Sequence, residues 1–162
     1  MKSVLLSAAA LWLVMGTIYA VDEPPLKEGL WSVRTQMIEN PGNRKDETTR
    51  SICRSHAFDA YAQSQRKNTK CRTLSENSAN GTITTVSECT VGTTLIKNTG
   101  TVTMTGDIAS HSEGHTTYTP AVNGMSESTI IMDQKYVGAC PAGVEPGDTI
   151  DADGKIQHTW KR

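Results

Sequence analysis

Residues 71–89, CRTLSENSANGTITTVSEC, predict two β-strands joined by a tight turn. We expect strands over 70–76 and 82–91, because the segment is rich in Thr and Asn-Gly is a strong turn signal. If the turn centres on Asn80, Cys71 and Cys89 lie opposite each other on the two strands. Facing residues of this kind have Cα atoms about 4.5 Å apart, a separation that a disulfide can bridge. We therefore predict a Cys71–Cys89 disulfide, unless the turn is displaced by a residue or two.

The other two cysteines, Cys53 and Cys140, are then left for each other. An even number of cysteines in an exported chain indicates disulfides, and four cysteines allow three pairings. Four buried free thiols are the alternative. A zinc site has less support, because the sequence contains no Cys-x-x-Cys.

Downstream of the hairpin, turn signals separate three more predicted strands, at 95–105, 108–119 and 125–137. Strands joined by short turns pair antiparallel, so we expect a meander. Placing Tyr118 opposite Ser126 in the last hairpin also places Ser112 opposite Met132 and Ile108 opposite Tyr136. Apolar side chains then gather on one face, a sorting that a one-residue slip would destroy.

Upstream, an alternating segment at 30–38 and a return strand at 48–53 flank the turn at 40–43. Ser55 can cap a helix over 56–66. The sequence therefore predicts a mainly β protein, an antiparallel meander of about seven strands curled into an open or closed barrel with one short helix. We expect one β-rich domain over 21–141. A Gly-, Pro- and Asp-rich tail over 142–162 follows, in which Ile150 and Ile156 could pair as a small hairpin.

The first 20 residues have the pattern of a signal peptide. Lys2 precedes an apolar run, and the segment ends in Ile18-Tyr19-Ala20. We expect cleavage after Ala20, a periplasmic or secreted mature protein, and no stable membrane insertion after cleavage. An uncleaved anchor is the alternative, since the uncharged stretch is just long enough to span a bilayer.

The net charge of the chain is −1, and removal of Lys2 with the leader makes it about −2. A near-neutral chain without a basic block argues against nucleic acid and anionic membrane surfaces as partners. The leader holds 15 of the roughly 58 apolar residues, so the mature domain is poor in apolar residues and we expect a thin core that depends on its disulfides.

Two polar clusters suggest metal binding but are better explained otherwise. His111 and His115 would share a helix face, but Gly114 and the following Thr residues favour a strand. Along a strand these histidines lie about 13 Å apart, too far for one ion. The cluster Asp148, Asp151, Asp153 and Gly154 lacks the spacing of a calcium loop and suits turns. We therefore expect no metal, no cofactor and no catalytic residue; no known catalytic motif is present.

Several segments together resemble a known family. Residues 28–33, EGLWSV, resemble the opening strand of the bacterial periplasmic proteins grouped as DUF3617. The resemblance continues in order through Cys53, the short helix, Lys70-Cys71, Cys89, Thr105-Gly106-Asp107 and residues 137–141, VGACP. Ser32 departs from the usual acidic residue, and the turn at 40–43 departs from a Met-rich one. The resemblance implies an exported β-rich domain with paired cysteines, and it implies no known activity.

For function we expect a non-enzymatic binding or chaperone-like module for an apolar or amphipathic ligand. A curled sheet can hold such a ligand on its concave face. The candidate lining residues are Trp31, Met104, Tyr118, Met132 and Tyr136, although the same residues could simply fill the core. The alternatives are a structural or interaction component of an envelope assembly, and an enzyme of unrecognised type.

Overall fold

The computed structural model describes residues 25–67 and 71–158. The predicted signal peptide and its cleavage site lie outside these residues. Seven long strands form most of the chain: β1 (Gly29–Asn40), β2 (Arg44–Arg54), β3 (Cys71–Ala79), β4 (Thr82–Val91), β5 (Thr94–Thr105), β6 (Ala109–Val122) and β7 (Met125–Gly138). One helix, α1 (His56–Lys67), and two short strands, β8 (Thr149–Ile150) and β9 (Ile156–Gln157), complete the described part. The predicted mainly β fold with one short helix is confirmed.

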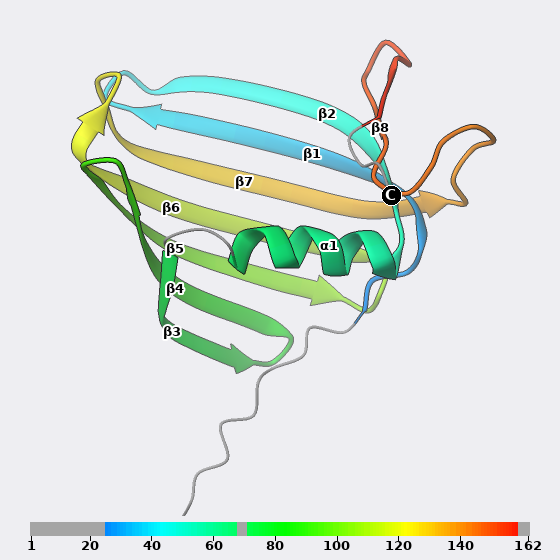
Figure 1. Ribbon diagram of the computed structural model, residues 1–162, viewed down its shortest axis with the longest axis horizontal. Helices are drawn as coiled ribbons and strands as arrows, with labels where there is room; N and C mark the ends of the chain where they lie inside the picture. The colour runs from blue at the N-terminus through cyan, green and yellow to red at the C-terminus, as the bar shows by residue number, and fades with distance from the viewer. Residues whose placement is uncertain (1–24, 68–70, 159–162) are drawn as a thin grey trace, which may run out of the picture.

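All nine strands belong to one antiparallel sheet in the order β3-β4-β5-β6-β7-β1-β2-β8-β9. Strands β3 to β7 form the predicted meander, and the N-terminal hairpin β1–β2 joins it through the β1–β7 pairing. The sheet curves into a half-barrel (Figure 1), and within the described residues no hydrogen bonds join β2 to β3 and close it. The barrel is therefore open on the side where the chain passes from β2 to β3.

Helix α1 occupies that passage. It follows β2 near one edge of the sheet and precedes β3 at the other, and it lies across the concave side of the sheet (Figure 1). Ser55 caps it as predicted, because the Ser55 Oγ accepts a hydrogen bond from the Phe58 amide at 3.2 Å. Asp59 lies in the first turn, where the helix dipole favours a negative charge.

The β3–β4 hairpin differs from the prediction in its turn. The turn consists of Asn80 and Gly81 alone, both at positive φ, so β3 continues to Ala79 and pairs with Thr82. A bulge at Leu74 then shifts the register by one residue. Cys71 lies opposite Cys89 because the shorter turn and the bulge compensate each other.

The β6–β7 hairpin has the predicted register over most of its length. Ser112 pairs with Met132, and the Tyr136 amide donates to the Ile108 carbonyl at 2.8 Å. Regular pairing ends at Thr117–Glu127, where the register becomes irregular. Tyr118 lies in this irregular stretch, so its predicted pairing with Ser126 stays a prediction, and its hydroxyl contacts the Ser128 hydroxyl at 3.0 Å.

The core of the described part is thin. Its buried hydrophobic residues are Trp31, Val33, Cys53, Ile83 and Val144. Trp31 is fully buried, and its Nε1 donates to the Lys27 carbonyl at 2.8 Å. The Tyr136 ring meets it edge-on at 6.0 Å, and the Arg54 guanidinium lies 5.5 Å from its centroid.

The four cysteines pair as the sequence predicted. Disulfides join Cys53 to Cys140 and Cys71 to Cys89, with Cα–Cα distances of 5.6 Å and 4.0 Å. The chain after Cys140 returns to β2, where the Cys53 amide donates to the Asp148 carbonyl at 3.0 Å and the Gly147 amide donates to the Cys53 carbonyl at 2.8 Å. Ile150 pairs with Ile156 in the small hairpin that the sequence suggested, and β8 extends the sheet at β2.

Among the described residues, no helix has the length and apolar character that a membrane span requires.

Candidate functional site

A hollow lies between α1 and the face of the sheet that α1 covers, which we call the inner face. Alternate residues of each strand point to this face. The hollow is a cavity of about 450 Å³. Strands from both halves of the sheet, the helix and the segment before β1 all contribute to its lining, which consists of Leu26, Val33, Arg50, Ile52, Arg54, Phe58, Asp59, Ala62, Gln63, Val102, Met104, Ser110, Ser112, Met132 and Gln134.

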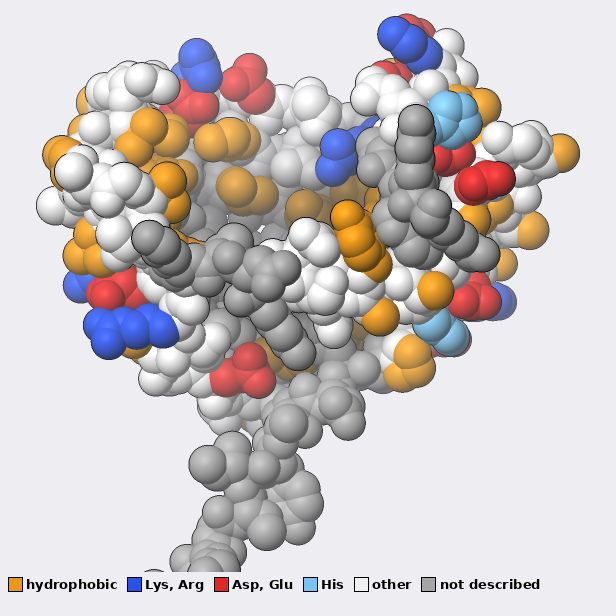
Figure 2. Space-filling view, in the orientation of Figure 1, with side chains coloured by type: hydrophobic (Ala, Val, Ile, Leu, Met, Phe, Trp, Pro, Cys, Tyr) orange, Lys and Arg blue, Asp and Glu red, His pale blue; other side chains and the backbone are white. Residues whose placement is uncertain are grey.

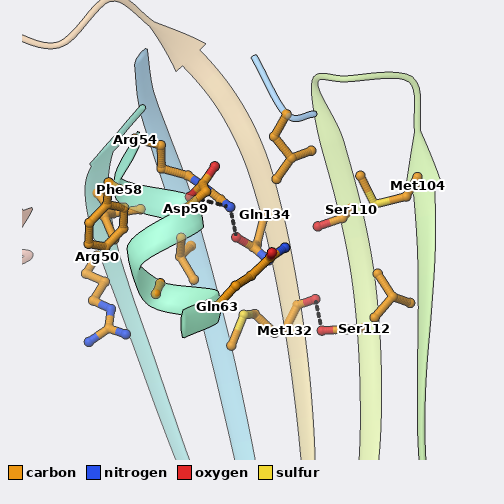
Figure 3. Close-up of a pocket in the computed structure, with 15 residues that line it drawn as sticks. Arg50, Arg54, Phe58, Asp59, Gln63, Met104, Ser110, Ser112, Met132 and Gln134 are labelled. Carbon is orange, nitrogen blue, oxygen red and sulfur yellow. Dashed lines mark hydrogen bonds and ion pairs between the residues drawn. The ribbon is translucent and has the colours of Figure 1, made fainter. Parts of the chain in front are cut away.

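Much of this lining is apolar. Phe58 and Ala62 lie one helical turn apart on α1, so they share the apolar side of the helix, which faces the cavity. Met104 and Met132 lie on the sheet side (Figure 3), and methionine is a flexible side chain that adapts to differently shaped partners. Figure 2 shows hydrophobic side chains inside the hollow of this face and charged side chains around it.

The polar part of the lining centres on Arg54. Its Nε and Nη2 lie 3.0 Å and 2.9 Å from Asp59 Oδ1, and its Nη1 donates to Gln134 Oε1 at 3.0 Å (Figure 3). The side chains of Arg54 and Asp59 are only 18% and 22% exposed, so this ion pair is largely withdrawn from water. The network fixes the start of α1 to β2 and β7, and the charges of Arg54 and Asp59 balance each other.

Arg50 is the third charged residue of the lining and differs from Arg54 in its surroundings. It lies two residues before Ile52 on the same face of β2, opposite Val33 of β1. It is exposed, and in Figure 3 its guanidinium points away from the other charged residues of the lining. Within the described residues, no carboxylate lies within ion-pair distance of it.

The inner face continues beyond the cavity into a part that α1 does not line. Gly100 of β5 and Gly114 of β6 pair with each other in this part. They are the next inner-face pair after Val102 and Ser112, which line the cavity. Ile130 of β7 pairs with Gly114 and is 37% exposed although it lies on the inner face. The inner face of the sheet is therefore accessible to solvent on this side of the cavity.

The five predicted lining residues fall into three groups. Met104 and Met132 line the cavity. Trp31 and Tyr136 lie one row further along the inner face and pack against each other under Lys27, whose Nζ is 4.6 Å from the Tyr136 centroid. Tyr118 lies in the uncovered part of the inner face, with its hydroxyl on Ser128. The role of these residues in ligand binding stays a prediction.

The polar lining was missed at the sequence level. Alternation along β2 places Arg50, Ile52 and Arg54 on one face, and this signal was available once Cys53 was assigned to the strand. Gln134 could not be found in this way, because its contact with Arg54 spans 80 residues. Phe58 and Ala62 were identifiable as an apolar stripe, but the surface that they cover depends on the path of α1.

The two clusters that suggested metal binding lie away from this cavity. His111 and His115 lie on the outer face of β6, where His111 Nδ1 is 2.7 Å from Asp133 Oδ1. Asp148 is buried and accepts a hydrogen bond from the Glu145 amide at 2.8 Å, while His158 Nδ1 lies 2.9 Å from it. Within the part of the chain that the structure describes, no three His, Cys, Asp or Glu side chains are placed to hold a metal ion.

The described lining of the cavity holds few groups that could take part in chemistry. Its described lining contains two serines, Ser110 and Ser112, but no histidine that could activate them. Its one carboxylate, Asp59, is already paired with Arg54. The arrangement offers an apolar surface with a few polar groups, which is typical of small-molecule sites.

The fold and the site therefore define a disulfide-bonded half-barrel with a helix-covered cavity. The chain belongs to the family described as protein of unknown function (DUF3617), whose model matches residues 26–140. The resemblance found in the sequence is thus confirmed. A comparison with curated proteins found no match.

Proposed function

We propose that this protein is an exported, periplasmic binding module that holds an apolar or amphipathic small molecule between α1 and the inner face of its sheet. The observation that carries the proposal is the cavity of about 450 Å³ with its mixed apolar and polar lining. Ligand sites are typically about 300–1,000 Å³, whereas a water molecule takes up only about 30 Å³ of liquid. A well-filled core would leave no space of this size.

Two further observations support parts of the proposal. Two disulfides are compatible with an exported protein, because disulfides persist in oxidising compartments. The large exposed hydrophobic side chains outside the cavity, such as Leu74, Val91 and Val137, are spread over several elements. This spread gives less support to the alternative of an apolar docking surface for an envelope protein.

The proposal is tested by filling the cavity. Met104→Trp places a bulky side chain in the lining, and Thr103→Trp is the matched control because Thr103 is the exposed neighbour on the other face of β5. The probe is N-phenyl-1-naphthylamine, whose fluorescence rises in apolar surroundings. We expect the unmodified protein and Thr103→Trp to enhance its fluorescence and Met104→Trp to do so at least about tenfold more weakly. Equal enhancement by both variants would show that the cavity is not the site.

The compartment is tested separately on protein recovered from the periplasm. Intact-mass measurement should show a chain that begins at Val21, and native mass spectrometry of the same sample should show a co-purifying small molecule. A chain that retains residues 1–20 would mean that the leader is an anchor.

A further inference from the structure

We propose that the ligand is a single-chain amphiphile with an anionic head group, and that Arg50 binds this head group at the margin of the cavity. The inference rests on the proposed function and specifies its ligand class. In this arrangement the alkyl chain occupies the space between α1 and the sheet, and the head group remains in contact with water.

The charges of the cavity favour an anion. Its described lining contains three charged residues, Arg50, Arg54 and Asp59. Arg54 and Asp59 neutralise each other in an ion pair at 2.9 Å, and the Arg54 Nη1 donates to Gln134 Oε1. Arg50 has no such partner among the described residues, so the lining carries one uncompensated positive charge. An anionic head group would compensate this charge, while a cationic one would be repelled.

The position of Arg50 suits a head group. Its pairing partner on β1, Val33, is buried, and its neighbour on the same face of β2, Ile52, lines the cavity. The pairing of β2 with β8 covers Ser51 and Ile52 but does not reach Arg50. In Figure 3 the Arg50 side chain extends away from the Arg54–Asp59 pair, and its guanidinium lies at the far end from that pair. An arginine at such a boundary can pack its stem on apolar surface and keep its charge in water.

The chemistry of the Arg50 guanidinium limits the kinds of anionic head group that it can bind well. Its planar donors match the two oxygens of a carboxylate, or the oxygens of a phosphate or sulfate. These head groups share one chemistry, a compact oxyanion at the end of an alkyl chain.

The competing explanation is that Arg50 is only a charge on an open strand edge. Charged residues on such edges prevent pairing with other chains, and β2 carries several, including Arg44 and Lys45. In that case replacement of Arg50 would leave the choice of ligand unchanged, and this difference makes the two explanations separable.

The experiment measures binding of three ten-carbon amphiphiles by isothermal titration calorimetry, below their micelle concentrations. The probes are decanoate, decanol and decyltrimethylammonium. Decyl sulfate and decyl phosphate form a further arm that distinguishes among the anionic head groups. The test variant is Arg50→Gln. The control variant is Lys135→Gln, which removes an equal charge from the exposed outer face of β7, next to Gln134.

We expect decanoate to bind the unmodified protein most tightly and decyltrimethylammonium most weakly. Arg50→Gln should weaken decanoate binding about three- to tenfold and leave decanol binding unchanged, as the loss of a partly screened charged hydrogen bond predicts. Lys135→Gln should retain the preference for decanoate. Arg50→Glu should reverse the preference, which separates a charge effect from any effect on folding.

Two results would overturn the inference, and they differ in meaning. If decanol and decanoate bind equally and Arg50→Gln changes neither, Arg50 is not the head-group site, although the cavity still binds alkyl chains. If none of the probes binds while the protein is folded by circular dichroism, the proposed binding function fails together with the inference.

Discussion

Cys53 and Cys140 are joined by a disulfide at the place where three distant segments of the chain meet. Cys53 is only 1% exposed, pairs with Leu30 of β1, and exchanges two backbone hydrogen bonds with residues 147 and 148. The bond thereby connects the end of β2 to the chain just after β7, over a separation of 87 residues. The contrasting disulfide, Cys71–Cys89, spans 18 residues within one hairpin, and Cys71 is exposed.

We expect the double replacement of Cys53 and Cys140 by Ala to lower the melting temperature more than the double replacement of Cys71 and Cys89. Loop-closure entropy assigns about 4–5 kcal/mol to the longer loop and about 3 kcal/mol to the shorter one. The buried position of Cys53 adds a cavity to the loss. Calorimetry of both double variants checks the order, and equal melting temperatures would show that the short hairpin bond matters as much as the long one.

Among the charged residues of the cavity lining, Arg54 should be the one whose replacement lowers the stability of the fold most. Arg54→Met keeps an apolar stem over Trp31 but leaves Asp59 and Gln134 without their partner. We expect a loss of about 2–3 kcal/mol in the free energy of unfolding, since a largely buried charge then lacks compensation. Arg72→Met is the matched control, because the Arg72–Glu88 pair involves an arginine side chain that is 71% exposed. Chemical denaturation of the control should show a change below about 1 kcal/mol.

Glu47 should make stability depend on pH in the acidic range. The hydrogen bond from Arg34, and then that from Gln36, hold the pKa of Glu47 at about 2, below its ordinary 4.5. A pKa that is lowered on folding contributes stability above about pH 4.5, and this contribution is lost as the pH falls towards 2. Glu47→Gln should therefore show a shallower fall of melting temperature between pH 5 and pH 2. If the melting temperature falls equally steeply with pH in Glu47→Gln and in the unmodified protein, this prediction is wrong. Glu76→Gln on β3 is the control, because it removes an equal charge.

Two strand glycines should respond oppositely to replacement by Ala. Gly29 of the EGLWSV segment has a φ of 136°, and a Cβ there would collide with the Gly138 carbonyl and approach the Tyr136 ring at 2.8 Å. Gly114 has no such constraint, since the nearest atom to an added Cβ is Asn98 Nδ2 at 3.5 Å. We expect Gly29→Ala to cost about 1–3 kcal/mol and Gly114→Ala to gain about 0.5–1 kcal/mol. Thermal denaturation measures the change in stability of each variant. A lower stability of Gly114→Ala would show that the packing at this position requires a residue without a side chain.

Local patterns in the sequence were sufficient for the strands, the helix and its cap. Alternation, Thr-rich composition and Asn-Gly turns act between neighbours in the chain, so they indicate β4 and β5 directly. The disulfide pairing was also accessible, because hairpin geometry placed Cys71 opposite Cys89 and left Cys53 for Cys140. The bulge at Leu74 was not accessible, since it becomes necessary only when both the two-residue turn and the disulfide are satisfied.

The sequence by itself determined a disulfide-bonded antiparallel β protein with one helix and the apolar residues that share a face. Only the tertiary structure decided that β1 pairs with β7, that the barrel stays open between β2 and β3, and that α1 crosses the opening. The cavity and the surroundings of Arg50 follow from that path. The physical reason is that side-chain alternation selects a face, whereas the neighbours across that face depend on contacts between segments far apart in the chain, such as Arg54 with Gln134.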